Sequence, residues 1–226
     1  MTGSTGSKGS IVLIHGAWHG AWCWDRVVSE LEELDVNVEA VELPYTGFDD
    51  NVAEARRAII DAGDRVVVCA HSGGGVTMSQ AASGLGSVVH LVYIAAFLVG
   101  PDEALDELIA LAPTGLLGAV TMDGDYSTVD PERARDLFYG DSSAEDIDRM
   151  VPLLRPMHMG VGEDVLRPAW MDVPTSYVVC SNDRALSPVV QRRMAQHAAN
   201  VVEWPTDHSP FLTRPRELAL LLCSYL

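Results

Sequence analysis

Ser72 is the residue whose surroundings point most directly to chemistry. It follows the apolar run at residues 66–69, and the small residues Ala70, Gly73 and Gly74 surround it. A serine on a tight turn between a strand and a helix is a nucleophile elbow, usually written G-x-S-x-G. Here Ala70 replaces the first glycine, and the Gly-Lys-Ser or Gly-Lys-Thr of a phosphate-binding loop is absent. The pattern therefore predicts a serine nucleophile.

A serine hydroxyl needs a neighbouring base to accept its proton. His208 follows the last expected strand, at 201–202, and precedes the last expected helix, at 214–225, so it is the predicted base. The remaining histidines fit this role less well because of their places in a strand, a helix, the central insertion or the loops near Ser72: His15, His19, His71, His90, His158 and His197.

The base in turn needs an acceptor that fixes its tautomer. Asp183 follows the expected strand at 176–180, so it lies at the carboxyl edge where such sheets place their sites. Asp207 is the neighbour of His208 and more plausibly shapes its loop, and Asp102 lies beyond the expected end of its strand. The resulting order Ser…Asp…His is that of hydrolases with a nucleophile elbow.

Acyl transfer also needs backbone donors for the developing oxyanion. The elbow offers the N–H of Gly73, and the loop at 15–20, after the first strand, offers the N–H of Ala17. We expect further residues to contact the substrate: Gly16, Trp18, His19, His71, Phe97 and Met157.

The elements that position these residues alternate along the chain. Short apolar, β-branched runs predict strands at 11–14, 36–41, 65–69, 88–94, 176–180 and 201–202. Helical patterns lie between them, at 22–34, 51–62, 75–83, 188–199 and 214–225. Continuously apolar strands that alternate with helices indicate an α/β fold with a mostly parallel, doubly wound sheet of about six strands.

The alternation is interrupted once, which suggests a domain division. Residues 1–10 are rich in Gly, Ser and Thr and predict a flexible tail, and 11–97 with 171–226 form the core. Residues 98–170 show helical patterns at 103–111, 131–139 and 144–154 but no convincing strand. We expect this segment to be a helical cap.

Composition excludes several functions. The chain has 15 basic and 32 acidic residues, a net charge of −17, which disfavours nucleic acid and anionic lipid as partners. No apolar run reaches the length of a membrane span, and the tail does not resemble a signal peptide. The four cysteines are widely spaced, so we expect no metal site and a cytoplasmic location.

These segments together resemble the α/β-hydrolase superfamily, in particular the branch of plant methyl esterases and hydroxynitrile lyases with their bacterial esterase relatives. The resemblance is carried by residues 15–24, 70–74, 173–183 and 207–210, and it extends over nearly the whole chain outside the insertion. It implies a six-stranded core that starts at the strand before the oxyanion loop, and a helical cap over the site.

Two positions separate the members of this branch. The lyases carry Thr where this chain has Gly16, and Lys directly after the catalytic histidine, where it has Ser209. Both positions look like the esterase side. Dehalogenases and epoxide hydrolases of the fold use an aspartate nucleophile, and Ser72 argues against them.

The expected function is hydrolysis of a small to medium, largely apolar carboxylic ester or lactone through an acyl-enzyme, with no cofactor. The alternatives are a lyase of the hydroxynitrile-lyase type, a cofactor-free oxygenase and a non-catalytic ligand receptor. The expected partner is a small-molecule ester, and the expected assembly is a monomer or homodimer.

Overall fold

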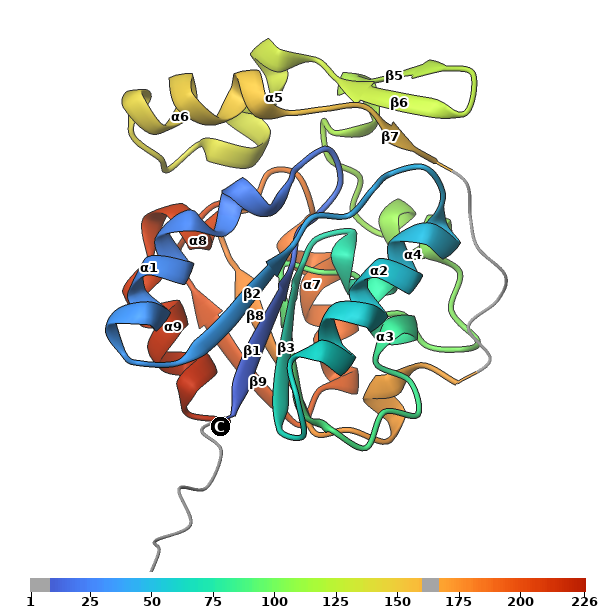
Figure 1. The fold of residues 1–226 in the computed structure, drawn as a ribbon. Helices are drawn as coiled ribbons and strands as arrows, with labels where there is room; N and C mark the ends of the chain where they lie inside the picture. The colour runs from blue at the N-terminus through green and yellow to red at the C-terminus, as the bar shows by residue number, and fades with distance from the viewer. Residues whose placement is uncertain (1–8, 160–166) are drawn as a thin grey trace, which may run out of the picture.

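A six-stranded parallel sheet forms the centre of the computed structural model, which describes residues 9–159 and 167–226 (Figure 1). In space the strands follow the order β2-β1-β3-β4-β8-β9. Their bounds are β1 (Ser10–Ile14), β2 (Asn37–Val41), β3 (Val66–His71), β4 (Val88–Ile94), β8 (Thr175–Cys180) and β9 (Asn200–Trp204). The predicted fold class is confirmed.

Helices cover both faces of this sheet (Figure 1). Side chains alternate along β1, so Ile11 and Leu13 pack with α1 and α9, whereas Val12 and Ile14 pack with α2, α3 and α7. The bounds are α1 (Asp25–Glu33), α2 (Phe48–Asp61), α3 (Gly74–Ala81), α7 (Pro188–Met194), α8 (Pro210–Thr213) and α9 (Pro215–Cys223), with 3₁₀ turns η1 (Ala21–Trp24) and η5 (Ala195–His197).

The chain reverses its direction across the sheet at β1. It passes from β1 to the edge strand β2 and then returns to β3 on the other side of β1. Connections that diverge in this way leave a crevice at the carboxyl ends of the two central strands, where ligands bind in open α/β sheets. Gly16 follows β1 and Ser72 follows β3, so both residues lie at this crevice.

The cap contains strands as well as helices, so the prediction of a purely helical segment is wrong. A three-stranded antiparallel sheet joins β5 (Val120–Asp123), β6 (Tyr126–Val129) and β7 (Met157–His158). These strands are short and partly polar, and residues 124–125 form a two-residue turn with Gly124 at φ 59°. The cap's other elements are α4 (Leu105–Ala110), α5 (Pro131–Tyr139), α6 (Ala144–Met150), η2 (Leu117–Ala119), η3 (Val151–Leu153) and η4 (Ala169–Met171).

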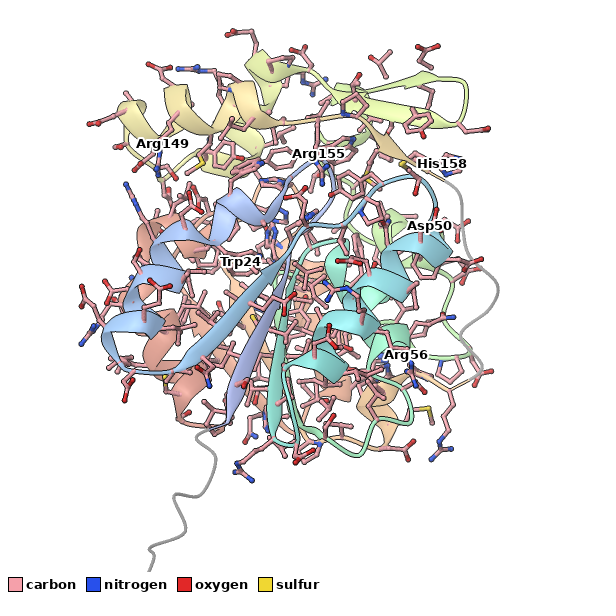
Figure 2. All side chains as sticks on the ribbon, in the orientation of Figure 1. Trp24, Asp50, Arg56, Arg149, Arg155 and His158 are labelled. Atoms are coloured by element: carbon pink, nitrogen blue, oxygen red, sulfur yellow. The ribbon has the colours of Figure 1, made fainter. Side chains whose placement is uncertain are left out.

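A partly buried ion pair joins the cap to the core. Arg26 of α1 forms two hydrogen bonds to the carboxylate of Asp146 in α6, at 2.5 and 3.2 Å, and it also donates to the carbonyl of Leu212. Arg149, at the underside of α6 in Figure 2, lies 3.6 Å from the same carboxylate. Phe138 of α5 packs into the apolar cluster of the core. The cap is therefore held by both charge and apolar contact.

The predicted boundaries need one correction. Ser10, which we assign to the tail, is the first residue of β1, because it pairs with Asn37 and Val66 in the sheet. Residues 1–8 of the expected tail, and 160–166 of the expected cap, lie outside the described residues. In the parts of the chain that are described, no helix combines the length and apolar character needed to cross a bilayer.

We predict that Gly74→Ala destabilises the protein by about 3 kcal/mol or more, as an overpacked core does. A Cβ at Gly74 would lie 3.0 Å from the carbonyl oxygen of Ile14 and closer still to that of His15. Gly86→Ala is the control, since its Cβ would meet nothing within 4 Å. Urea unfolding of both variants measures the difference, and equal midpoints would contradict this tight packing of α3 on β1.

Candidate active site

Ser72 adopts a backbone conformation that is costly for a residue with a side chain. Its φ is 50°, in the left-handed region, directly after β3. Its N–H donates to the carbonyl of Ile94, and its own carbonyl accepts from Gly75 and Phe97 at 3.1 and 3.0 Å. Such strain persists where the surrounding structure holds it, and it is concentrated at functional sites. The predicted sharp turn is therefore present at Ser72.

The loop after β1 passes directly over this turn. A Cβ on Gly16 would lie 2.7 Å from the Cβ of Ser72, so only glycine allows the approach. The next residue, Ala17, places its backbone nitrogen 3.5 Å from where a Cβ of Gly73 would be. Within residues 9–159 and 167–226, neither the N–H of Ala17 nor that of Gly73 donates to another protein group. Both predicted oxyanion donors therefore lie side by side.

His208 and Asp183 form a buried pair. Nδ1 of His208 donates to Oδ2 of Asp183 at 2.6 Å, and both side chains are almost fully buried. The N–H groups of Ala185 and Leu186 donate to the other carboxylate oxygen, at 2.8 and 2.9 Å, and Gln191 donates to Oδ2 at 2.7 Å. The carboxylate is thus held in place by four donors, and Nε2 of His208 is left as the acceptor nitrogen.

The structure distinguishes Asp183 from the other two candidate acids. Asp207 accepts the N–H groups of Ser209 and Asp141, at 2.9 and 2.8 Å, so its carboxylate ties the His208 loop to the cap. Burial raises the pKa of Asp207. Asp102 is exposed beyond the end of β4. Among the three, Asp183 is the one hydrogen-bonded to the imidazole.

Ser72 and His208 line one apolar cavity. Its walls come from the loop after β4, the cap and the segment after Asp183, and its other lining residues are Phe97, Ile109, Ala112, Thr114, Leu116, Leu117, Ala185, Leu186, Ser187 and Val190. Of these described residues, none carries a charged side chain. The hydroxyl of Thr114 donates to the carbonyl of Ala185 at 2.8 Å, and that of Ser187 accepts the N–H of Val189 at 3.3 Å, so both polar side chains of the wall have a partner.

Of the predicted substrate contacts, Phe97 lines this cavity and Gly16 contacts Ser72. The lining does not include Trp18, whose indole N–H donates to Ser127 at 3.0 Å, or Met157, which is half-buried in β7. It also does not include His19 or His71. The expected substrate contacts of these four residues therefore lack support from the cavity geometry.

His19 and His71 are buried behind the cavity and bond to backbone carbonyls. Nδ1 of His19 lies 2.8 Å from the carbonyl oxygen of Ala17, and Nε2 accepts a hydrogen bond from the hydroxyl of Tyr139 at 2.9 Å. Nε2 of His71 donates to the carbonyl of His208 at 2.8 Å. Each ring therefore fixes the backbone of a loop that carries a candidate site residue.

Sequence reasoning missed the cap residues of the cavity wall and Gln191. The residues at 109–117 lie in the insertion, where no pattern relates them to Ser72. Gln191 is a polar residue on the buried face of α7, and that position is the signal that could have found it. In the described part of the chain, no group of three or more His, Cys, Asp or Glu residues could hold a metal ion.

The chain matches the model of the alpha/beta hydrolase family over residues 11–219, and it belongs to that family. The predicted family is thereby confirmed. Methyl jasmonate esterase 1 of Vitis vinifera is 28% identical, over 95% of this chain and 94% of its own. The alpha/beta hydrolase nvfD of Aspergillus novofumigatus is 27% identical, with 92% of each chain covered.

Solved structures share the same fold. Tomato methylketone synthase I in complex with 2-tridecanone gives a TM-score of 0.84 at 22% identity, with 97% of this chain and 98% of that chain covered. A pyrethroid hydrolase from Sphingobium faniae JZ-2 gives 0.84 at 23% identity, with 96% of each chain covered. The overall fold of this chain is thus shared with these solved structures.

We predict that the protein loses stability as the pH falls from 6.5 towards 4. Burial lowers the pKa of His15 to about 3, of His19 to about 4 and of His71 well below its usual value. The unfolded chain therefore binds more protons in this range than the folded chain does. Each histidine lowers the free energy of unfolding by about 2 kcal/mol at pH 5 relative to pH 8.

Urea unfolding at pH 8, 6.5 and 5 measures this loss, and His19→Gln is the matched variant because it removes one of the three titrating groups. In this variant, the difference between the free energies of unfolding at pH 8 and pH 5 should be smaller by about 2 kcal/mol. A free energy of unfolding that is the same at pH 8 and pH 5 would show that these histidines are not neutral in the folded protein.

Proposed function

We propose that the protein is a serine esterase that hydrolyses a small to medium, largely apolar carboxylic ester. One observation carries the proposal: the buried His208–Asp183 pair, joined at 2.6 Å, shares a cavity edge with Ser72 on its strained turn. This combination of nucleophile, base and orienting carboxylate supports acyl transfer. The names of the esterase relatives agree with it.

In the first step, Oγ of Ser72 attacks the ester carbonyl while Nε2 of His208 takes its proton. Asp183 accepts the Nδ1–H of the imidazole and stabilises the positive charge that the ring gains. The N–H groups of Ala17 and Gly73, which have no acceptor among the described residues, would bind the tetrahedral oxyanion. His208 then protonates the leaving alcohol, and the acyl-enzyme remains.

In the second step, His208 activates a water that attacks the acyl-enzyme and releases the acid. The same two backbone donors stabilise the second oxyanion. The reaction needs no group beyond the side chains and N–H groups named here.

The cavity supports the substrate class. None of the described residues that line it is charged, so an ionised acyl group would lose its hydration without gaining an ionic partner. The aliphatic walls at Ile109, Leu116 and Val190 match an apolar chain or ring. The similar proteins include a methyl jasmonate esterase and, by structure, a pyrethroid hydrolase, and we propose apolar esters as the substrates of this chain.

We predict that Ser72→Ala abolishes hydrolysis of p-nitrophenyl esters and labelling by a fluorophosphonate. Asp183→Asn is expected to lower kcat by about 10³- to 10⁴-fold because the amide selects the wrong imidazole tautomer. Asp207→Asn is the control, since its buried carboxylate accepts the N–H groups of Ser209 and Asp141 and the hydroxyl of Thr206 rather than the imidazole of His208. Turnover by Ser72→Ala, or equal losses in the two Asp variants, would contradict the proposed roles.

We predict that Ala112→Phe narrows the cavity and shifts the preference towards short acyl chains. The ratio of kcat/KM for the octanoyl ester to that for the acetyl ester is expected to fall about tenfold or more, because the new ring fills space that a long chain needs. Leu111→Phe, at an exposed neighbouring position outside the lining, serves as the control. An unchanged chain-length profile in Ala112→Phe would show that the acyl chain binds elsewhere.

A further inference from the structure

We infer that Tyr45 is a positioning residue for the oxyanion hole: its hydroxyl holds the Gly16–Ala17 peptide so that the N–H of Ala17 faces the reacting carbonyl. This inference rests on the proposed function and extends it to a residue outside the cavity. Tyr45 lies between β2 and α2, and its hydroxyl donates to the carbonyl oxygen of Gly16.

The carbonyl of Gly16 and the N–H of Ala17 belong to one planar trans peptide group, so they point in opposite directions. Any donor that fixes the carbonyl therefore fixes the direction of the N–H. Besides Tyr45, Nδ1 of His15 lies 3.0 Å from this oxygen, and the N–H of His19 lies 3.3 Å from it. The orientation of the Ala17 N–H is thus set from behind by groups that do not touch the substrate.

The hydrogen-bond pattern determines which atom donates. Nε2 of His15 accepts the N–H of Leu43 at 3.1 Å, so the proton of the neutral ring is on Nδ1. Nδ1 already bears a proton, and the Tyr45 hydroxyl 3.1 Å away therefore directs its own hydrogen to Gly16. Burial lowers the pKa of His15 to about 3, which keeps this arrangement intact near neutral pH.

The position of Tyr45 is itself held by several contacts. Its φ is 59°, a conformation that an aromatic residue adopts only when its surroundings impose it. Its N–H donates to Asn51 at 2.9 Å, and its ring lies edge-on to that of His15, with centroids 5.3 Å apart. The residue as a whole is 4% exposed. The hydroxyl is therefore presented to Gly16 by a rigid support.

Arg155 connects the cap to this support. Its guanidinium lies 4.6 Å from the centre of the Tyr45 ring and donates to the carbonyls of His19 and Leu43, at 3.1 and 2.7 Å. The backbone N–H of Arg155 donates to the carbonyl of Trp18 at 2.9 Å. Figure 2 shows Arg155 where the cap meets the loops at the carboxyl edge of the sheet. The cap therefore braces the oxyanion loop and Tyr45 together.

The test is Tyr45→Phe, which removes only the hydroxyl. We expect kcat for p-nitrophenyl butyrate to fall about 10- to 100-fold, with KM changed less than about twofold, because a misdirected donor weakens transition-state binding alone.

A trifluoromethyl ketone gives an independent readout. Oγ of Ser72 adds to its carbonyl carbon, the carbonyl π pair moves to oxygen, and His208 takes the serine proton, so the adduct carries the same oxyanion. Its affinity should fall by the same factor as kcat/KM.

Tyr93→Phe is the matched control. Tyr93 is fully buried, and its hydroxyl pairs with Ser79 at 2.7 Å, away from the oxyanion loop. It should leave kcat and the ketone affinity close to the wild-type values. An equal loss in Tyr93→Phe would overturn the inference, because the effect would then come from general loosening. Wild-type kcat and ketone affinity in Tyr45→Phe would overturn it as well.

A second variant keeps the inference testable if Tyr45→Phe does not fold. Arg155→Met removes the cation above the ring, and we expect a loss of about threefold to tenfold in kcat and in ketone affinity. Unchanged values in folded Arg155→Met would overturn the inference, because the contacts that hold Tyr45 would then have no effect on the oxyanion hole. Ser72→Ala separates a failure of the proposed function from a failure of the inference about Tyr45. Hydrolysis by Ser72→Ala overturns the proposed function. Loss of activity in Ser72→Ala together with wild-type activity in Tyr45→Phe overturns only the inference about Tyr45.

Discussion

The close approach of two loops at the carboxyl edge of the sheet determines the rest of the site. Neighbouring strands lie about 4.8 Å apart, so the loop after β1 and the turn after β3 leave the sheet in contact. Gly16 has no side chain to separate them. Ser72 adopts an unfavourable, positive φ at the point where the two loops meet. Two backbone donors, on Ala17 and Gly73, become neighbours as a result, and neither has an acceptor among the described residues. Because the approach depends on backbone atoms, it leaves the side chains of the cavity walls free to vary.

Neutral buried histidines support this arrangement from behind. His15, His19 and His71 each lie within hydrogen-bond distance of a backbone carbonyl in a loop of the site. Hydrogen bonds in such a water-poor region are strong, and an unpaired polar group there is costly, so the loops have few alternative arrangements. Charged residues would be poor replacements because their burial would require ionic partners. The reaction that we propose would then use a backbone that is already in place, which limits reorganisation.

The sequence predicted what depends on chain order and local pattern. Ser72, Asp183 and His208 each follow a strand of a parallel sheet, so strand order alone brings them to one edge. The cap was harder because its strands have two to four residues, too few for a clear period, although residues 123–125 carry a turn sequence. No sequence pattern pointed to Tyr45 or Arg155 as residues of the site. Their contacts join β2's loop, β1's loop and the cap, and only the tertiary structure brings these segments together.

The dispersal of the site along the chain also has a kinetic consequence. The segments that meet at the cavity include Gly16, Ser72, Phe97, Asp183 and His208, so no short stretch of the chain contains a working part of the site. His208 is the last of them, and its loop follows β9, which pairs only with β8 at the edge of the sheet. During synthesis, a chain that has folded its first four strands still lacks the proposed base. The proposed site is therefore completed late, when the edge strand joins the sheet and brings the imidazole of His208 to Asp183.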